Sequence, residues 1–249
     1  MSSDPYVDLD FDKLTPGYLD LLKRSLTGIL YEDPDINTRV FVENHRHIGS
    51  DWPYSGKTMI GMVGLGNTER LVKRVIADKV EGDLVECGVW RGGTCIFMQG
   101  ILTEHNETHR QVWVVDSFRG LPPPIYPIDP DLASVPCLAV PLPEVKHNFE
   151  LYNLLGSNVH FLEGWFEDTL PTAPIEKIAY LRLDGDLYKS TMDTLENLYP
   201  KLSSGGFIDI DDYPLECCRT AVEEYRTRMG ITEHLRYGPG VHGVYWRKP

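Results

Sequence analysis

The chain has 249 residues, a length that suits one large domain or a domain with a small appendage. Its 24 lysines and arginines against 37 aspartates and glutamates give a formal net charge of −13, which argues against a nucleic-acid partner. No apolar run approaches the roughly 20 residues that span a bilayer. The acidic start "MSSDPYVDLDFDKL" has no export signal, and five cysteines without CxxC spacing fit reduced thiols. We therefore expect a cytoplasmic protein with no membrane partner.

The first 60 residues do not share the pattern of the rest of the chain. We predict that residues 1–60 form a helical appendage, followed by the loop "ENHRHIGSDWPYSGKTMIG", and that this part packs on the functional site. Residues 61–249 are predicted to form the main domain.

From about residue 83 onward, short strands alternate with helices. The strands are predicted at 83–89, 112–118, 159–166, 178–186 and 205–213, and the helices at 94–105, 143–155, 190–202 and 215–230. This alternation predicts an α/β fold with a doubly wound, mostly parallel sheet. The tail "HLRYGPGVHGVYWRK" has a Gly-Pro-Gly turn between two strand-like pieces, so we expect a C-terminal antiparallel hairpin.

A proline-rich stretch, "RGLPPPIYPIDPDLASVPCLAVPL", interrupts the alternation at residues 119–142. A loop of this length inside a compact domain is usually a lid or a binding element. We predict a lid over residues 119–147, and a disordered insertion is the alternative.

Acidic residues stand at or near the ends of all five predicted parallel strands. They are Glu86, Asp116, Glu163, Asp184, Asp186, Asp211 and Asp212. Ligands of open parallel sheets collect at the carboxyl ends of the strands. A single carboxylate there is often a helix cap, but a series of them points to a functional site.

The segment "VECGVWRGGTC" forms a glycine-rich turn after the first strand. Its spacing does not match G-x-G-x-x-G, because Trp90 stands where a second glycine is needed. The turn instead suits a nucleoside without phosphates, such as S-adenosylmethionine, near Glu86 and Gly88. Asp116 at the end of the second strand has the acceptor geometry for ribose hydroxyls. A purely structural role for these residues stays open.

Two carboxylates, Asp184 and Asp186, follow the strand "IAYLRL" one residue apart. We expect them to point to opposite sides, with only Asp184 facing the site and Asp186 serving as a helix cap or as support behind the site. Asp184 with Asp211 and Asp212 would place three carboxylates at one point, where they repel unless they share a proton or bind a hard cation. Oxygen ligands favour Mg²⁺ or Ca²⁺ over zinc.

Seven blocks along the chain resemble the macrocin-type sugar O-methyltransferases: "DWP…TMIG", "VECGVWRGGTCIFM", "VWVVDSF", "GWFEDTLP", "LRLDGDLY", "GGFIDIDDY" and "GVYWR". The resemblance covers roughly residues 15–248. It implies a class I, Rossmann-like methyltransferase that uses S-adenosylmethionine and a divalent metal, Mg²⁺ with Ca²⁺ as a substitute, in antibiotic biosynthesis. The acceptor would be a hydroxyl of a deoxysugar, either nucleotide-linked, as in the family's enediyne branch that methylates a nucleotide-activated rhamnose, or part of a glycosylated product.

The resemblance also implies residue roles. Asp184, Asp211 and Asp212 match the metal ligands, and Asp184 also matches the general base. Positions near the cofactor are Met59, Ile60, Glu86, Gly88, Asp116, Ser117, Phe118, Gly164 and Trp165. We further expect a homo-oligomer, a dimer or larger.

Several alternatives stay open. A metal-dependent hydrolase could use the same three aspartates, and a protein of the same fold could bind without turnover. His147 and His242 could orient the substrate or act as a base, or be solvated or structural. Trp90, Trp165 and Tyr245 could stack on a ligand or belong to the core.

Overall fold

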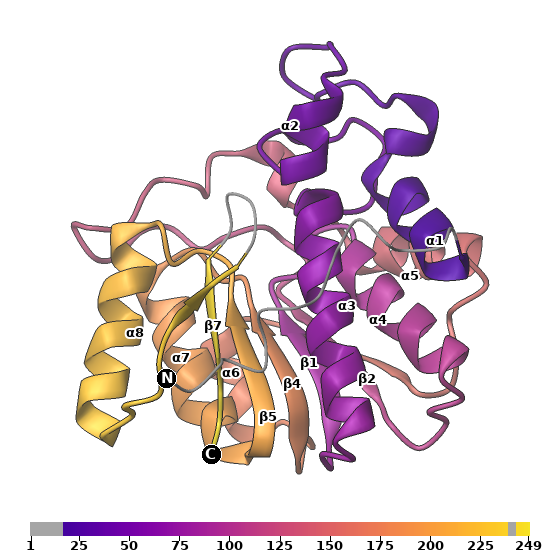
Figure 1. Ribbon diagram of the computed structural model, residues 1–249. Helices are drawn as coiled ribbons and strands as arrows, with labels where there is room; N and C mark the ends of the chain where they lie inside the picture. Colours follow the sequence, from indigo (N-terminus) through magenta and orange to yellow (C-terminus); the bar gives the residue numbers. More distant parts are fainter. Residues whose placement is uncertain (1–16, 239–242) are drawn as a thin grey trace, which may run out of the picture.

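Figure 1 shows the protein as a computed structural model, which describes residues 17–238 and 243–249. These residues form a seven-stranded sheet with the strand order β3-β2-β1-β4-β5-β7-β6. The first five strands are mutually parallel, and the last two run antiparallel. The strands are β1 (Asp83–Cys87), β2 (Val112–Asp116), β3 (Val159–Glu163), β4 (Ile178–Leu183), β5 (Leu202–Ile210), β6 (Arg236–Tyr237) and β7 (Val244–Arg247).

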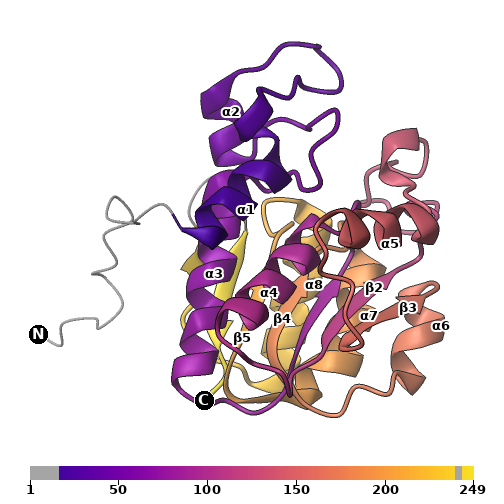
Figure 2. The same ribbon diagram turned by 90° about the vertical axis from the view of Figure 1, so that its right-hand side faces the viewer.

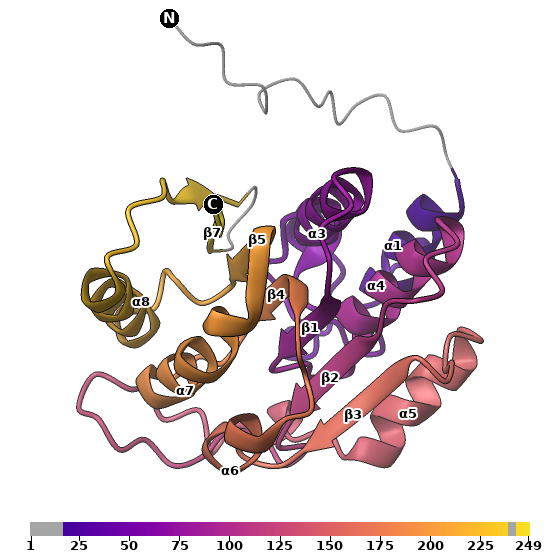
Figure 3. The same ribbon diagram turned by 90° about the horizontal axis from the view of Figure 1, so that it is seen from below.

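Helices cover both faces of the sheet (Figure 3). Alternate strand residues point to opposite faces, so Leu84 belongs to the core under one helical layer and Val85 to the core under the other. The first layer consists of α3 (Gly61–Ala77), α4 (Gly93–Glu104) and α5 (Leu142–Leu151), with α1 (Tyr18–Thr27) packed against α3 and α4. The second layer consists of α6 (Phe166–Thr169), α7 (Tyr188–Leu198) and α8 (Glu216–Met229).

The N-terminal part lies against the first layer and above the carboxyl ends of the strands (Figures 1 and 2). Leu22 and Leu26 of α1 share one apolar core with α3 and α4. Beyond α1, the short helix α2 (Glu43–Ile48) carries the buried Arg46, whose guanidinium donates two hydrogen bonds to Asp51, both at 2.9 Å. These hydrogen bonds order the loops near the strand ends. The domain boundary at residue 60 stays a prediction.

The predicted α/β architecture, with its antiparallel C-terminal strands, is confirmed. Three helices differ from the expectation: α2 lies inside a predicted loop, and neither α3 nor the short α6 had a predicted counterpart. The sequence of α3, "GMVGLGNTERLVKRVIA", contains three glycines, which lower helix propensity, while packing on the sheet compensates. The parallel strands also end earlier than predicted. After β2 and β4, positive φ at Phe118 and Asp186 turns the backbone away from the direction of the strand.

The proline-rich segment is anchored at several points. Trp90 Nε1 donates to the Cys137 carbonyl at 2.8 Å, and the Tyr188 amide donates to Asp129 Oδ1 at 2.9 Å. The rings of Tyr126 and Tyr188 pack with centroids 4.6 Å apart. The last part of the predicted lid is helix α5 instead, and His147 on this helix is exposed. Among the described residues, no helix has the length and apolarity needed to cross a membrane.

Candidate active site

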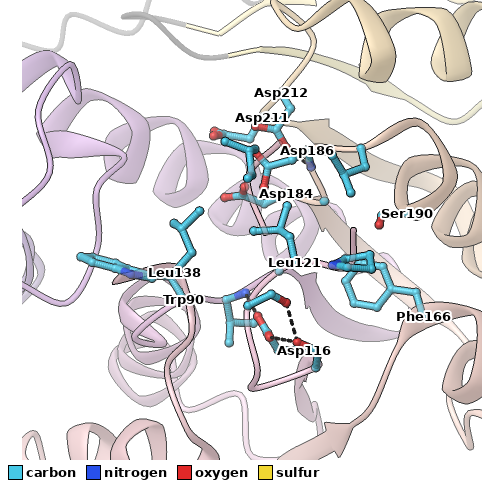
Figure 4. A pocket seen from close by; sticks show the side chains of 18 of the residues that line it. Trp90, Asp116, Leu121, Leu138, Phe166, Asp184, Asp186, Ser190, Asp211 and Asp212 are labelled. Carbon is cyan, nitrogen blue, oxygen red and sulfur yellow. Dashed lines mark hydrogen bonds between the residues drawn. The ribbon is translucent and has the colours of Figure 1, made fainter. Parts of the chain in front are cut away.

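A cavity of about 720 Å³ opens at the carboxyl ends of the parallel strands (Figure 4). It is lined by the loop before α3, the glycine-rich turn after β1, the end of β2, the proline-rich segment, and the segments that follow β3, β4 and β5. Most predicted site residues lie on its wall, namely Met59, Ile60, Glu86, Gly88, Asp116, Ser117, Trp165, Asp184, Asp211 and Asp212. Trp90 also lines it, whereas Tyr245 packs against Phe207.

Gly88 brings the glycine-rich turn against the end of β4. Its φ is +86°, and a Cβ at this position would lie 1.5 Å from the Asp184 carbonyl oxygen. The Asp184 amide donates to the Cys87 carbonyl at 2.8 Å. Only glycine permits this approach, so the turn directly sets the position of Asp184.

Asp116 organises the other side of the cavity through backbone amides. The amide of Val89 donates to its Oδ2 at 2.8 Å, and the amide of Phe118 donates to its Oδ1 at 2.7 Å. Burial raises the pKa of Asp116, whereas these amides lower it. Phe118 and Gly164 do not line the cavity. They brace Asp116 instead, because the Gly164 amide donates to the Asp116 carbonyl at 3.0 Å.

Three carboxylates, those of Asp184, Asp186 and Asp212, form an acidic cluster in which one oxygen from each lies within 4.8 Å of the others. The Asp186 amide donates to Asp212 Oδ2 at 2.8 Å. Figure 4 shows these side chains with Asp211 on one side of the cavity. The expectation that Asp186 points away was wrong. Residues two apart on an extended chain share a face, and a φ of 55° at Asp186 turns the backbone back toward Asp212.

The acidic cluster is electrostatically unfavourable by itself. Burial raises the pKa of Asp184 well above its ordinary value, and the nearby Asp211 and Asp212 raise it further. Burial and Asp184 raise the pKa of Asp186 to about 8. Crowded carboxylates of this kind are relieved by protons or by a hard cation, and oxygen donors suit Mg²⁺ or Ca²⁺. The residues present therefore fit the divalent ion that the sequence predicts.

Arg182, which was not predicted as a site residue, contacts three acids of this site. Its Nε donates to Glu86 Oε1 at 2.9 Å, and its Nη2 donates to Asp184 Oδ2 at 2.8 Å. The same Nη2 lies 2.8 Å from Asp211 Oδ1. Cys95 Sγ donates to the other Glu86 oxygen at 2.8 Å. The available signal was a lone arginine within the buried strand "IAYLRL".

Glu86 should make stability depend on pH. Burial raises its pKa to about 7, although Arg182 acts in the opposite direction. A raised folded-state pKa contributes stability that is fully present below the unfolded value of 4.5 and is lost as pH rises through about 7. The free energy of unfolding of the unaltered protein, relative to Glu86→Gln, should therefore fall between these pH values. Urea unfolding in EDTA measures this difference. Parallel pH curves would contradict the prediction, and the exposed Glu163→Gln is the control.

The sequence profile of the Macrocin-O-methyltransferase (TylF) family matches residues 34–248. The chain belongs to this family. Membership makes it an O-methyltransferase and implies S-adenosylmethionine as the methyl donor. It sets aside the metal-dependent hydrolase and the binding protein without turnover.

The relatives of this family member cover nearly its whole length. The chain is 49% identical over 240 residues to 8-demethyl-8-(2,3-dimethoxy-alpha-L-rhamnosyl)-tetracenomycin-C 4′-O-methyltransferase of Streptomyces olivaceus, covering 92% of each chain. The solved structure of the O-methyltransferase NovP is 48% identical, with a TM-score of 0.90 and coverage of 93% of this chain and 98% of NovP. Calicheamicin methyltransferase CalS11 is 21% identical, with a TM-score of 0.62 and coverage of 98% and 99%, which shows a shared fold.

Proposed function

We propose that this O-methyltransferase methylates a hydroxyl of a deoxysugar that is already attached to a natural product, with the help of a divalent cation, Mg²⁺ by preference. One observation carries the proposal: the glycine-rich turn with Glu86 and Asp116 and the acidic cluster open into the same cavity. A methyl donor over the turn and a sugar beside the carboxylates would thus meet in one space.

Each half of the cavity has a proposed role. Met59, Ile60, Glu86, Gly88, Asp116, Ser117 and Trp165 would hold S-adenosylmethionine, with Phe118 and Gly164 bracing Asp116 from behind. Asp184, Asp211 and Asp212 would hold the cation. Asp186, which belongs to the acidic cluster, would attract the same ion through its negative charge.

The chemical obstacle is the acceptor, because a protonated sugar hydroxyl is a poor nucleophile. When bound, S-adenosylmethionine supplies an electrophilic methyl group, and the cation favours ionisation of the hydroxyl. Asp184 would accept the hydroxyl proton as general base. The rest of the cavity wall would orient the two reactants and exclude water, and orientation of this kind contributes strongly to rate.

The charge of the cavity supports a neutral glycoside over a nucleotide sugar. Among the described residues that line the cavity, nine are acidic and Lys189 alone is basic. Lys189 already pairs with Glu167 at 2.9 Å and with Asp193 at 2.8 Å. A diphosphate would thus meet mainly negative charge. The proline-rich segment adds an apolar wall that suits an apolar aglycone, formed by Leu121, Pro122, Pro123, Ile125, Pro130, Leu132 and Leu138.

The experiment compares acceptors that carry the same deoxysugar. Rhamnosides of apolar aglycones and a nucleoside diphosphate rhamnose are incubated with S-adenosylmethionine and Mg²⁺. We expect the glycosides to gain the mass of one methylene, with one S-adenosylhomocysteine formed per product. Faster methylation of the nucleotide sugar would contradict the glycoside assignment, and no S-adenosylhomocysteine with any sugar would contradict the function. The homo-oligomer stays a prediction that light scattering can test.

A further inference from the structure

The guanidinium of Arg182 contacts three acids of the cavity wall: Glu86 beside the glycine-rich turn, and Asp184 and Asp211 on the side of the acidic cluster. On β4, Arg182 is in register with Glu86 of β1 and with Asp209 of β5. Its side chain is only 3% exposed. Burying a cation to this degree costs desolvation free energy unless its partners are well placed. The contacts of Arg182 therefore need an explanation.

The contacts of Arg182 join groups that belong to different parts of the site. Its Nη2 engages one oxygen of Asp184 and one oxygen of Asp211, each at 2.8 Å. Its Nε is anchored by Glu86 at 2.9 Å. Arg182 therefore holds one oxygen of each aspartate, and its planar guanidinium determines how the two carboxylates are turned.

We propose that Arg182 is a positioning residue that aims the carboxylates of Asp184 and Asp211 at the divalent cation and ties them to the turn that carries Glu86. The inference rests on the proposed function, because it assumes that these aspartates bind the ion. Arg182 itself touches neither the ion nor the sugar; it acts through the two aspartates.

Lysine cannot replace this geometry even though it keeps the charge. Arginine presents its donors in a rigid fork, whereas the lysine ammonium is a point charge on a flexible stem. In Arg182→Lys the acids keep a neutralising cation but lose the constraint on their orientation. Residues that orient metal ligands typically contribute 10–100-fold to metal affinity.

The test measures binding of Mn²⁺ alone, followed by electron paramagnetic resonance, without methyl donor or sugar. We expect Arg182→Lys to weaken Mn²⁺ binding about 10–100-fold with little change in melting temperature. Arg226→Lys is the matched control: Arg226 is also buried, 8% exposed, but its Nη2 donates to the Glu233 carbonyl in another part of the structure. This control should bind Mn²⁺ like the unaltered protein.

The outcomes separate the inference from the function on which it rests. If the unaltered protein binds no Mn²⁺, the proposed metal site fails. If the unaltered protein and Arg182→Lys bind Mn²⁺ equally, only the role of Arg182 is overturned. Equal weakening in both lysine variants would also overturn it, because the effect would then be general.

A second replacement covers the case in which Arg182→Lys does not fold. Arg182→Met fills the same space without charge, and Ca²⁺ binding is measured by calorimetry near neutral pH and at about pH 9. Without the arginine the acids hold protons more tightly, but a loss caused by protonation disappears at the higher pH, whereas lost positioning does not. Recovery of affinity at high pH would overturn the proposal. If neither Arg182→Lys nor Arg182→Met folds, the proposal is overturned too, because the arginine would then act on stability alone.

Discussion

Asp184→Ala should lower methyl transfer at least about a thousandfold while S-adenosylmethionine still binds. The substitution removes the proposed general base and one proposed ligand of the cation together. The fold should survive, because Arg182 keeps Glu86 and Asp211 as partners. Gly88 and Asp116 on the cofactor side are unchanged.

Three measurements check this expectation. Product formation is followed by mass spectrometry, cofactor binding by calorimetry with S-adenosylhomocysteine, and folding by circular dichroism. In the unaltered protein, EDTA should suppress turnover and Mg²⁺ should restore it. Asp168→Ala, at an exposed acid on α6, should behave like the unaltered protein. Full activity of Asp184→Ala would count against both roles of this carboxylate.

Gly88→Ala should lower the free energy of unfolding by more than about 3 kcal/mol and methyl transfer by at least about a hundredfold. The added Cβ would lie 1.5 Å from the Asp184 carbonyl oxygen, and a backbone atom cannot rotate away as a side chain can. Either the turn or the end of β4 must therefore move, and both carry residues of the cavity wall.

A matched glycine separates this contact from backbone strain. Gly230 ends α8 with a φ of +66°, and a Cβ there would meet nothing within 4 Å. Gly230→Ala should therefore cost only the left-handed conformation, about 1–2 kcal/mol, and leave the rate unchanged. Urea unfolding and initial rates of all three proteins provide the comparison. If the two alanine variants are equally stable and equally active, the close approach of Gly88 to the Asp184 carbonyl does not matter for function.

Much of the fold could be predicted because its signals are local. Short runs of apolar and β-branched residues at 83–87 and 112–116 identify buried strands, and the longer segment 94–105 between them is predicted as a helix. Helix α3 was not predicted because its three glycines weaken the helical signal. Its apolar face stabilises the helix only when it packs against the sheet. Helix α2 was missed because six residues are too few for a periodic pattern.

The site could be predicted less completely than the fold. That carboxylates follow β4 and β5 is visible in "LRLDGD" and "IDIDD", and the strand order does bring Asp184 and Asp212 together. The role of Asp186 was predicted wrongly, because the direction of its side chain depends on a backbone turn with positive φ. The residue type alone does not predict this turn. Phe118 and Gly164 support Asp116 from outside the cavity. A sequence motif cannot distinguish residues that support the site from residues that line the cavity.

The amino-acid sequence by itself determined the succession of strands and helices and the placement of acidic residues just after the strands. It determined these features because periodicity and turn residues act over a few neighbours. Only the tertiary structure decided which of those residues meet. Glu86 and Arg182 are 96 positions apart and bond because β1 lies next to β4. Such a contact depends on the order of strands in the sheet, and no local pattern encodes that order.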